Sequence, residues 1–334
     1  MPCFKNKALT IDMGSAADTQ AVSQVRLVEV TREEAGQRID NFLSRHLKGV
    51  PRSKIYRILR RGEVRVNSGR IPPGYKLEAG DRVRIPPVRV AAGLAPTVPG
   101  HWLPDIEARV VFENARLLVI DKPSGFAVHG GSGISHGIIE VLRARRPDAP
   151  YLELVHRLDR DTSGCLIIAK RRSALRALHE QLRNGQMTKR YLALVRGRWT
   201  DGRRRVTAAL EKNRLQGGER VVRVAADGKS AETVFRPVSV HDVASLVEVD
   251  LHTGRTHQIR VHAAHIDYPL AGDPRYGDPE FNRIMKSLGL RRLFLHAHLI
   301  EFTEPAGDEV LTVSTPLDDE LKRVLDNLER QTDD

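Results

Sequence analysis

The sequence predicts an α+β protein, in which a body built on a mixed, largely antiparallel β-sheet follows a small basic α+β module. Two observations predict this class. After residue 108, short apolar runs alternate with turns and few helices intervene. Before residue 91, basic residues crowd onto a pattern of two helices and two strands. The chain has 334 residues and is 40% hydrophobic, so it is long enough for two units and too apolar for wholesale disorder.

Residues 1–24 are polar and have no apolar stretch of the secretory kind, so we expect a disordered tail. The two cysteines, Cys3 and Cys165, cannot build a disulfide framework or a multi-cysteine zinc site, which favours a reducing, cytoplasmic compartment. No apolar run approaches the roughly 18 residues that span a bilayer, and we find no lipidation signal. We therefore expect no membrane partner, and a monomer because no strong dimer signal is present.

Residues 25–90 are expected to form a small unit of two helices and two strands. The first helix begins near Arg38; the second follows Pro51, which suits a first helical turn, and ends near Gly62. Residues 63–67 and 81–85 alternate apolar and polar side chains as strands do. The apolar side chains of each helix fall on one face; they are Ile39, Phe42, Leu43 and Leu47, then Ile55, Ile58 and Leu59.

The positive charge is concentrated in this unit. The chain carries 54 Lys and Arg against 42 Asp and Glu, a net charge of +12, and residues 38–90 hold 14 of the former against 4 of the latter. A solvated basic face is the plainer interpretation of a charge run, but this density favours contact with the phosphates of a nucleic acid.

The pattern RIDNFLSRHL, then PRSKIYRILRRGEVRVNSGRI, resembles the S4 RNA-binding domain over about 50 residues. The resemblance implies that the second helix and the following turn present basic side chains to folded RNA. The candidate phosphate contacts that it implies are Arg52, Lys54, Arg57, Arg60 and Arg61.

Residues 91–108 are rich in Pro and Gly and are expected to be a linker. Residues 109–334 are expected to form the larger body. Its predicted strands are 117–120, 165–169, 191–195, 244–251 and 293–302, and its predicted helices are 173–182, 256–266 and 318–329.

Three chemical patterns in the body are weak. Ser135 lies in a Gly-Ile-Ser-His-Gly match to a hydrolase nucleophile elbow, but a glycine-rich loop precedes it where a buried strand is required. His257, His262 and His265 are spaced so that the first two do not share a helix face, so a metal site is not expected. Cys165 opens an apolar strand and is expected to be buried and inert.

Residues 155–164, VHRLDRDTSG, are a stronger candidate for chemistry. Asp161, Thr162 and Ser163 are expected to cap backbone N–H groups in a turn, with Gly164 at positive φ. This leaves Asp159 without an assigned structural role, other than an exposed ion pair. A carboxylate held among arginines stays ionised and is able to act as a nucleophile.

HRLDRDTSG, with LLVIDKPSG before it and TKRYLALVRG and TGRTHQIRVHAAHIDYPLAGDPRYG after it, resembles the RluA-type family of pseudouridine synthases. The four motifs cover the body in the family's order. The resemblance implies the pseudouridine synthase fold and the isomerisation of uridine to pseudouridine in RNA, which is redox-neutral and requires no cofactor and no metal.

The resemblance also implies roles for single residues. Asp159 is the essential carboxylate, attacking either C6 of the base or C1′ of the sugar. Arg260 pairs with Asp159, and Tyr191 stacks on the base and offers its hydroxyl for moving the C5 proton. Arg157 enters the space that a flipped base vacates, and Arg255 is a candidate contact for the RNA backbone. His156 is a candidate for orienting the loop, and Lys122 and His129 are either structural or in contact with RNA.

With an S4 domain in front, the resemblance is strongest to family members that modify 23S ribosomal RNA. This implies 23S ribosomal RNA or an assembling large ribosomal subunit as the partner. The alternative is a non-catalytic S4-type protein that binds ribosomal RNA or assists assembly.

Overall fold

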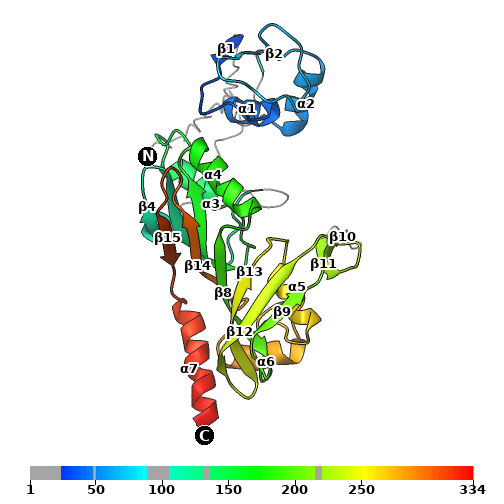
Figure 1. Cartoon of the computed structure of the whole chain (residues 1–334), viewed down its shortest axis with the longest axis vertical. Coiled ribbons are helices and arrows are strands. Elements are labelled where there is room, and N and C mark those ends of the chain that lie inside the picture. The colour runs from blue at the N-terminus through cyan, green and yellow to red at the C-terminus, as the bar shows by residue number, and fades with distance from the viewer. Residues whose placement is uncertain (1–23, 48–49, 89–104, 131–135, 215–219, 334) are drawn as a thin grey trace, which may run out of the picture. The chain divides into compact units, whose positions relative to one another are not determined.

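The computed structural model describes residues 24–47, 50–88, 105–130, 136–214 and 220–333 (Figure 1). The chain divides into two units, Met1–Thr97 and Val98–Asp334. The expected tail, residues 1–24, lies outside the described residues except for its last residue.

The first unit packs two helices against a three-stranded antiparallel sheet of order β1-β3-β2. The predicted helix faces are buried together in one apolar core, and Gly62 follows the second helix at φ +68°. A short strand at the start of the unit, which the sequence pattern did not reveal, pairs with β3. The elements are β1 (Arg26–Glu29), α1 (Ile39–His46), α2 (Arg52–Arg60), β2 (Arg65–Val66) and β3 (Arg82–Ile85).

The second unit is built on one ten-stranded sheet, whose main path runs β4-β5-β7-β14-β8-β13-β12-β9. Every pairing in it is antiparallel except that of β7 with β14, so the predicted mixed, largely antiparallel sheet is confirmed. The strands are β4 (Val110–Glu113), β5 (Leu117–Lys122), β6 (Glu153–Leu154), β7 (Ser163–Ala169), β8 (Thr188–Arg196), β9 (Arg204–Thr207), β12 (Glu232–Val240), β13 (Ala244–Leu251), β14 (Leu295–Thr303) and β15 (Val310–Ser314).

Helices cover both faces of this sheet because its strands are apolar on both sides. On β8, Ala193 and Val195 join the core that contains α3 and α5, whereas Leu194 points into the core of α6 and α7. The helix α4 covers the second face near β5 and β7. The helices are α3 (Ile138–Arg145), α4 (Arg172–Arg183), α5 (Gln258–His265), α6 (Pro279–Ser287) and α7 (Asp319–Asp333), and a separate hairpin joins β10 (Leu210–Arg214) to β11 (Arg220–Val224).

The C-terminal boundary predicted for the linker, residues 91–108, lies too far along the chain. Most of the linker lies outside the described residues, but Ile106 is already buried in the core that contains α3, directly before the short 3₁₀ helix Glu107–Arg109. The apolar side chain of Ile106 therefore places its residue in the second unit. Among the described residues, no helix has the length and apolar character needed to cross a membrane.

Candidate active site

The turn that carries Asp159 connects β6 to β7 and is fixed from beneath by buried polar groups. Nζ of Lys122 donates to the carbonyl oxygens of Pro123, Phe126 and Arg160, at 2.8–2.9 Å. Burial lowers the pKa of Lys122 to about 7, although the negative charges of the nearby Asp161 and Asp159 act to raise it. Three N–H donors exist only on the ammonium form, so these three bonds favour the charged form and oppose the effect of burial. Of the two roles open for Lys122, its burial favours the structural one.

A second support for the turn comes from histidine. Nε2 of His156 accepts a hydrogen bond from the N–H of Ile167 at 3.1 Å, which fixes the ring beside β7. Burial lowers the pKa of His156 to about 4, so the ring is neutral and able to accept.

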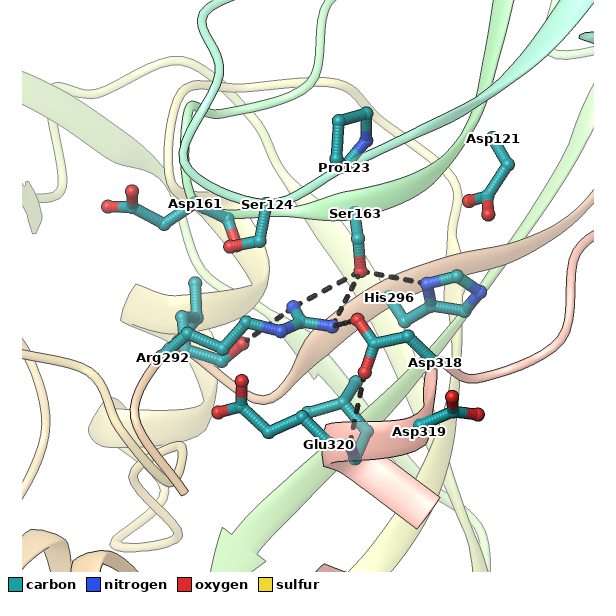
Figure 2. Close-up of polar contacts among 12 residues, drawn as sticks. Asp121, Pro123, Ser124, Asp161, Ser163, Arg292, His296, Asp318, Asp319 and Glu320 are labelled. Carbon is teal, nitrogen blue, oxygen red and sulfur yellow. Dashed lines mark hydrogen bonds and ion pairs between the residues drawn. The ribbon is translucent and has the colours of Figure 1, made fainter. Parts of the chain in front are cut away.

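The side chains that follow Asp159 act differently from the prediction that they cap N–H groups. Figure 2 shows Oγ of Ser163 between the imidazole of His296 and the guanidinium of Arg292. It lies 2.8 Å from Nδ1 of His296 and 3.2 Å from both Nη1 and Nη2 of Arg292. The capping role is therefore wrong for Ser163. The side chain of Asp161 instead pairs with Nε of Arg160 at 3.1 Å.

Gly164 has φ +106°, as the sequence predicts. A Cβ atom there would lie 2.3 Å from the carbonyl oxygen of Ala297 on β14. The close approach of β7 and β14 behind the turn therefore requires glycine.

The carboxylate of Asp159 faces two nitrogen groups from the start of α5. Its Oδ2 lies 3.8 Å from Nη1 of Arg260 and 3.9 Å from Nε2 of His257. The Asp159 side chain is 30% exposed, whereas that of Arg260 is 6% exposed. The half-buried carboxyl group of Asp159 therefore stands beside the buried guanidinium of Arg260.

Arg260 has a stronger partner that the sequence analysis missed. Asp273 accepts two hydrogen bonds from it, from Nε and Nη2, both at 2.7 Å. Burial raises the pKa of Asp273, but the bonds from Arg260 and from the N–H groups of Tyr276 and Arg275 outweigh it and lower the pKa overall. Arg260 is thus held rigidly by one carboxylate while it faces another.

Tyr191 lies on β8 and is buried, and burial together with the charge of Asp159 raises the pKa of its hydroxyl. The phenol is therefore protonated at neutral pH and able to donate a hydrogen bond.

One pocket collects the predicted catalytic and base-flipping residues. Asp159, Tyr191, Arg260, Arg157 and Arg255 all line it. Leucine and isoleucine side chains supply its apolar wall, from Leu158, Leu251, Ile259 and Leu295. Apolar walls around one carboxylate and one fixed guanidinium suit a flat, polar ring such as a nucleobase. The described residues contain no group of three or more His, Cys, Asp or Glu side chains placed to hold a metal ion.

Comparison with known proteins agrees with this geometry. A family model described as RNA pseudouridylate synthase matches residues 116–265, and an S4 domain model matches residues 37–83. Ribosomal large subunit pseudouridine synthase C of Escherichia coli (strain K12) is 57% identical over 91% of this chain and 97% of its own length. The protein of the same name from Pasteurella multocida (strain Pm70) is 53% identical over 96% of this chain and 99% of its own.

The chain belongs to the RNA pseudouridylate synthases.

Two solved structures of this family share the fold. Human RNA pseudouridylate synthase domain containing 4 aligns at a TM-score of 0.55 with 26% identity, over 67% of this chain and 94% of that one. Human RNA pseudouridylate synthase domain containing 1 aligns at 0.53 with 27% identity, over 62% and 82%. The family resemblance is therefore confirmed, and the catalytic interpretation is favoured over a non-catalytic RNA-binding protein.

In this pseudouridylate synthase the S4 domain presents its basic side chains on the outer face of α2. Arg52, Arg57, Arg60 and Arg61 are exposed and Lys54 is half-buried, while the apolar face of the helix is buried. Among the contacts of this surface, Arg52 reaches Asn41 at 3.4 Å and Arg61 reaches Glu63 at 3.8 Å.

The weaker patterns of the sequence have structural explanations or lie outside the described residues. Ser135 is among the residues that are not described. Cys165 is buried, and burial raises its pKa to about 11, as expected for an inert thiol. His262 is buried and contacts the carbonyl of Ala208, whereas His265 is exposed, so these two do not share a site with His257.

Proposed function

We propose that this enzyme converts uridines of 23S ribosomal RNA to pseudouridine, on free RNA or on an assembling large subunit. The relatives named ribosomal large subunit pseudouridine synthase C support this substrate, because they match nearly the whole chain. The S4 domain supports it as well, since its exposed arginines offer charge to RNA phosphates. We further propose that the enzyme works as a cytoplasmic monomer without a membrane partner.

The observation that carries the proposed chemistry is that Asp159, Tyr191 and Arg260 come from three separate motifs and line one pocket. In the reaction the N1–C1′ bond of uridine breaks, the uracil turns, and C5 bonds to C1′. The C5 proton is lost and N1 gains a proton, so no electrons are exchanged. Asp159 serves as the nucleophile, toward either C6 or C1′, and its side chain is exposed enough to meet the substrate.

Arg260 places a guanidinium 3.8 Å from the carboxyl group of Asp159, so a fixed positive charge faces the proposed nucleophile. We assign Tyr191 to stacking against the base, with its protonated hydroxyl near the atoms that exchange protons. Arg157 is exposed at the same pocket, in a position to fill the gap that a flipped uridine leaves. Arg255 is also exposed and supports a contact with the RNA backbone.

The test is to incubate the enzyme with unmodified large-subunit RNA and to map pseudouridine by carbodiimide-dependent stops of reverse transcription. We expect stops with the wild type and none with Asp159→Asn. Asp161→Asn is the matched control, since it removes a carboxylate two residues away that does not line the pocket, and should remain active. RNA binding without any new stops would instead support the non-catalytic S4 protein.

A further inference from the structure

His257 adopts a backbone conformation that side-chain-bearing residues rarely take. Its φ is +52° and its ψ is 20°, the left-handed region, directly before the first residue of α5. This conformation is unfavourable for a residue with a Cβ atom, and such residues cluster at functional sites. The conformation places the imidazole between two groups: Nε2 is 3.9 Å from Oδ2 of Asp159, and Nδ1 is 2.9 Å from the hydroxyl of Tyr276.

The hydrogen-bond partners determine where the proton of this imidazole sits. The hydroxyl of Tyr276 accepts a hydrogen bond from the N–H of Val222 on β11 at 3.0 Å, which leaves its own proton free to donate. An ionised Asp159 is only an acceptor, so the nitrogen that faces it must carry a proton. Burial lowers the pKa of His257, although Asp159 acts in the opposite direction, and a neutral ring carries only one proton. The neutral tautomer that suits both neighbours carries its proton on Nε2 and accepts on Nδ1 from Tyr276.

Tyr276 also supports the other group that faces Asp159. The guanidinium of Arg260 lies over its ring, 5.0 Å from the centroid. Its backbone N–H donates to Oδ1 of Asp273, the carboxylate that holds Arg260. A single tyrosine thus holds both nitrogen groups that approach Oδ2 of Asp159.

We propose that His257 is a positioning residue for Asp159, and that the Tyr276 hydroxyl fixes its imidazole with the Nε2–H directed at the carboxylate. The proposal rests on the function proposed above for Asp159. A separation of 3.9 Å exceeds a hydrogen bond, and contacts of this kind commonly shorten when substrate fills the site. In the substrate complex the Nε2–H then donates to Oδ2 and aims the other carboxylate oxygen at the uridine.

The test is chemical rescue of His257→Gly. Glycine takes the left-handed conformation without strain and leaves a space the size of the ring. We expect the single-turnover rate of pseudouridine formation to fall about 10- to 100-fold, the loss typical of a misplaced reacting group, with the Kd for RNA within about twofold. Added imidazole should restore part of the rate. The same concentration of 1-methylimidazole should not, because its ring can accept from Tyr276 but has no N–H for Asp159.

Two further variants make the test specific. Tyr276→Phe keeps the ring beneath Arg260 and removes only the hydroxyl, so we expect a loss of about 3- to 10-fold, as for one hydrogen bond. This variant also carries the test if His257→Gly does not fold, as judged by circular dichroism. His265→Gly is the matched control, because His265 is exposed in the last turn of the same helix, and its rate should be unchanged with or without imidazole.

An undiminished rate in His257→Gly, equal rescue by both imidazoles, or a full rate in Tyr276→Phe would overturn the inference while leaving Asp159 as the nucleophile. Full activity of Asp159→Asn would overturn both the inference and the proposed function.

Discussion

At the scale of the residue, the buried pair of Arg260 and Asp273 is expected to control both the stability and the active site. Asp273→Asn keeps the shape of the side chain but leaves the Arg260 charge without its partner in the core. Breaking a buried pair in this way costs about 3–5 kcal/mol in the free energy of unfolding. Urea denaturation followed by circular dichroism measures this change, and the single-turnover rate should fall with it because Arg260 also faces Asp159.

A surface pair provides the comparison. Arg198 and Asp242 are 2.9 Å apart with both side chains largely exposed. Asp242→Asn should therefore change the unfolding free energy by less than about 1 kcal/mol. If the two aspartate variants were destabilised by similar amounts, the burial of Asp273 would not be what makes its pair important.

The motifs of the sequence single out Asp159, Arg260 and Tyr191 as candidates, and the structure brings all three to one pocket, while their roles stay predictions. The sequence was not sufficient for Asp273, which is joined to Arg260 by a hydrogen bond across 13 residues that no helical or strand period predicts. The sequence analysis weighs His257 only as a metal ligand. The predicted helix begins at 256, inside which His257 would have ordinary helical geometry, so the contact with Asp159 is not expected. Because the backbone of His257 is left-handed, the helix begins at Gln258, and the ring of His257 faces Asp159.

At the scale of the element, β7 must run beside β14 with no side chain between them at Gly164. Gly164→Ala would add a Cβ 2.3 Å from the Ala297 carbonyl at φ +106°, so strain and overlap add together. We expect a decrease of about 3 kcal/mol or more in the free energy of unfolding, together with lower activity because the strand follows the Asp159 turn. Thermal and urea unfolding provide the measurement.

Gly185 separates backbone strain from steric overlap. It has φ +68°, but a Cβ there would meet nothing within 4 Å. Gly185→Ala should therefore cost only the backbone strain, about 1–2 kcal/mol. Equal destabilisation of the two alanine variants would contradict the close approach of β7 to β14.

Elements with a strong period were predictable from the sequence, and those without one were not. The strand 244–251 was predicted with its observed bounds, since apolar side chains recur along it from Ala244 to Leu251. The helix α6 was missed although its signals are present: Asp278 accepts a hydrogen bond from the N–H of Phe281, and Pro279 occupies the first turn. The strand β10 has only one apolar side chain, Leu210, so its sequence gives no strand signal, and its pairing with β11 defines the hairpin.

At the scale of the whole molecule, the two units are expected to divide the work, with the S4 domain supplying affinity and the body supplying chemistry. Replacing Arg57 and Arg60 by Gln in the full chain should reduce the slope of log K against log salt by about 0.7–0.9 for each RNA phosphate that is no longer neutralised. The single-turnover rate at saturating RNA should be unchanged. Filter binding over a range of salt concentrations measures the slope.

The control for this prediction removes an equal charge elsewhere. Lys322 and Arg323 are exposed on α7, a helix that also carries many acidic residues. Replacing both by Gln should leave the salt slope as it is in the wild type. A slope that both double variants reduce equally would mean that net charge, and not the S4 surface, sets the affinity for RNA.

The place of β14 in the sheet has a consequence for how the enzyme is made. This strand lies between β7 and β8, and it pairs His296 with Ser163, although it is synthesised long after both neighbouring strands. The two halves of the sheet therefore cannot join until nearly the whole polypeptide has left the ribosome. We expect a nascent chain to acquire its catalytic pocket as one of the last events of its biogenesis, and a chain that terminates before β14 to be degraded as an unfinished sheet with open edges.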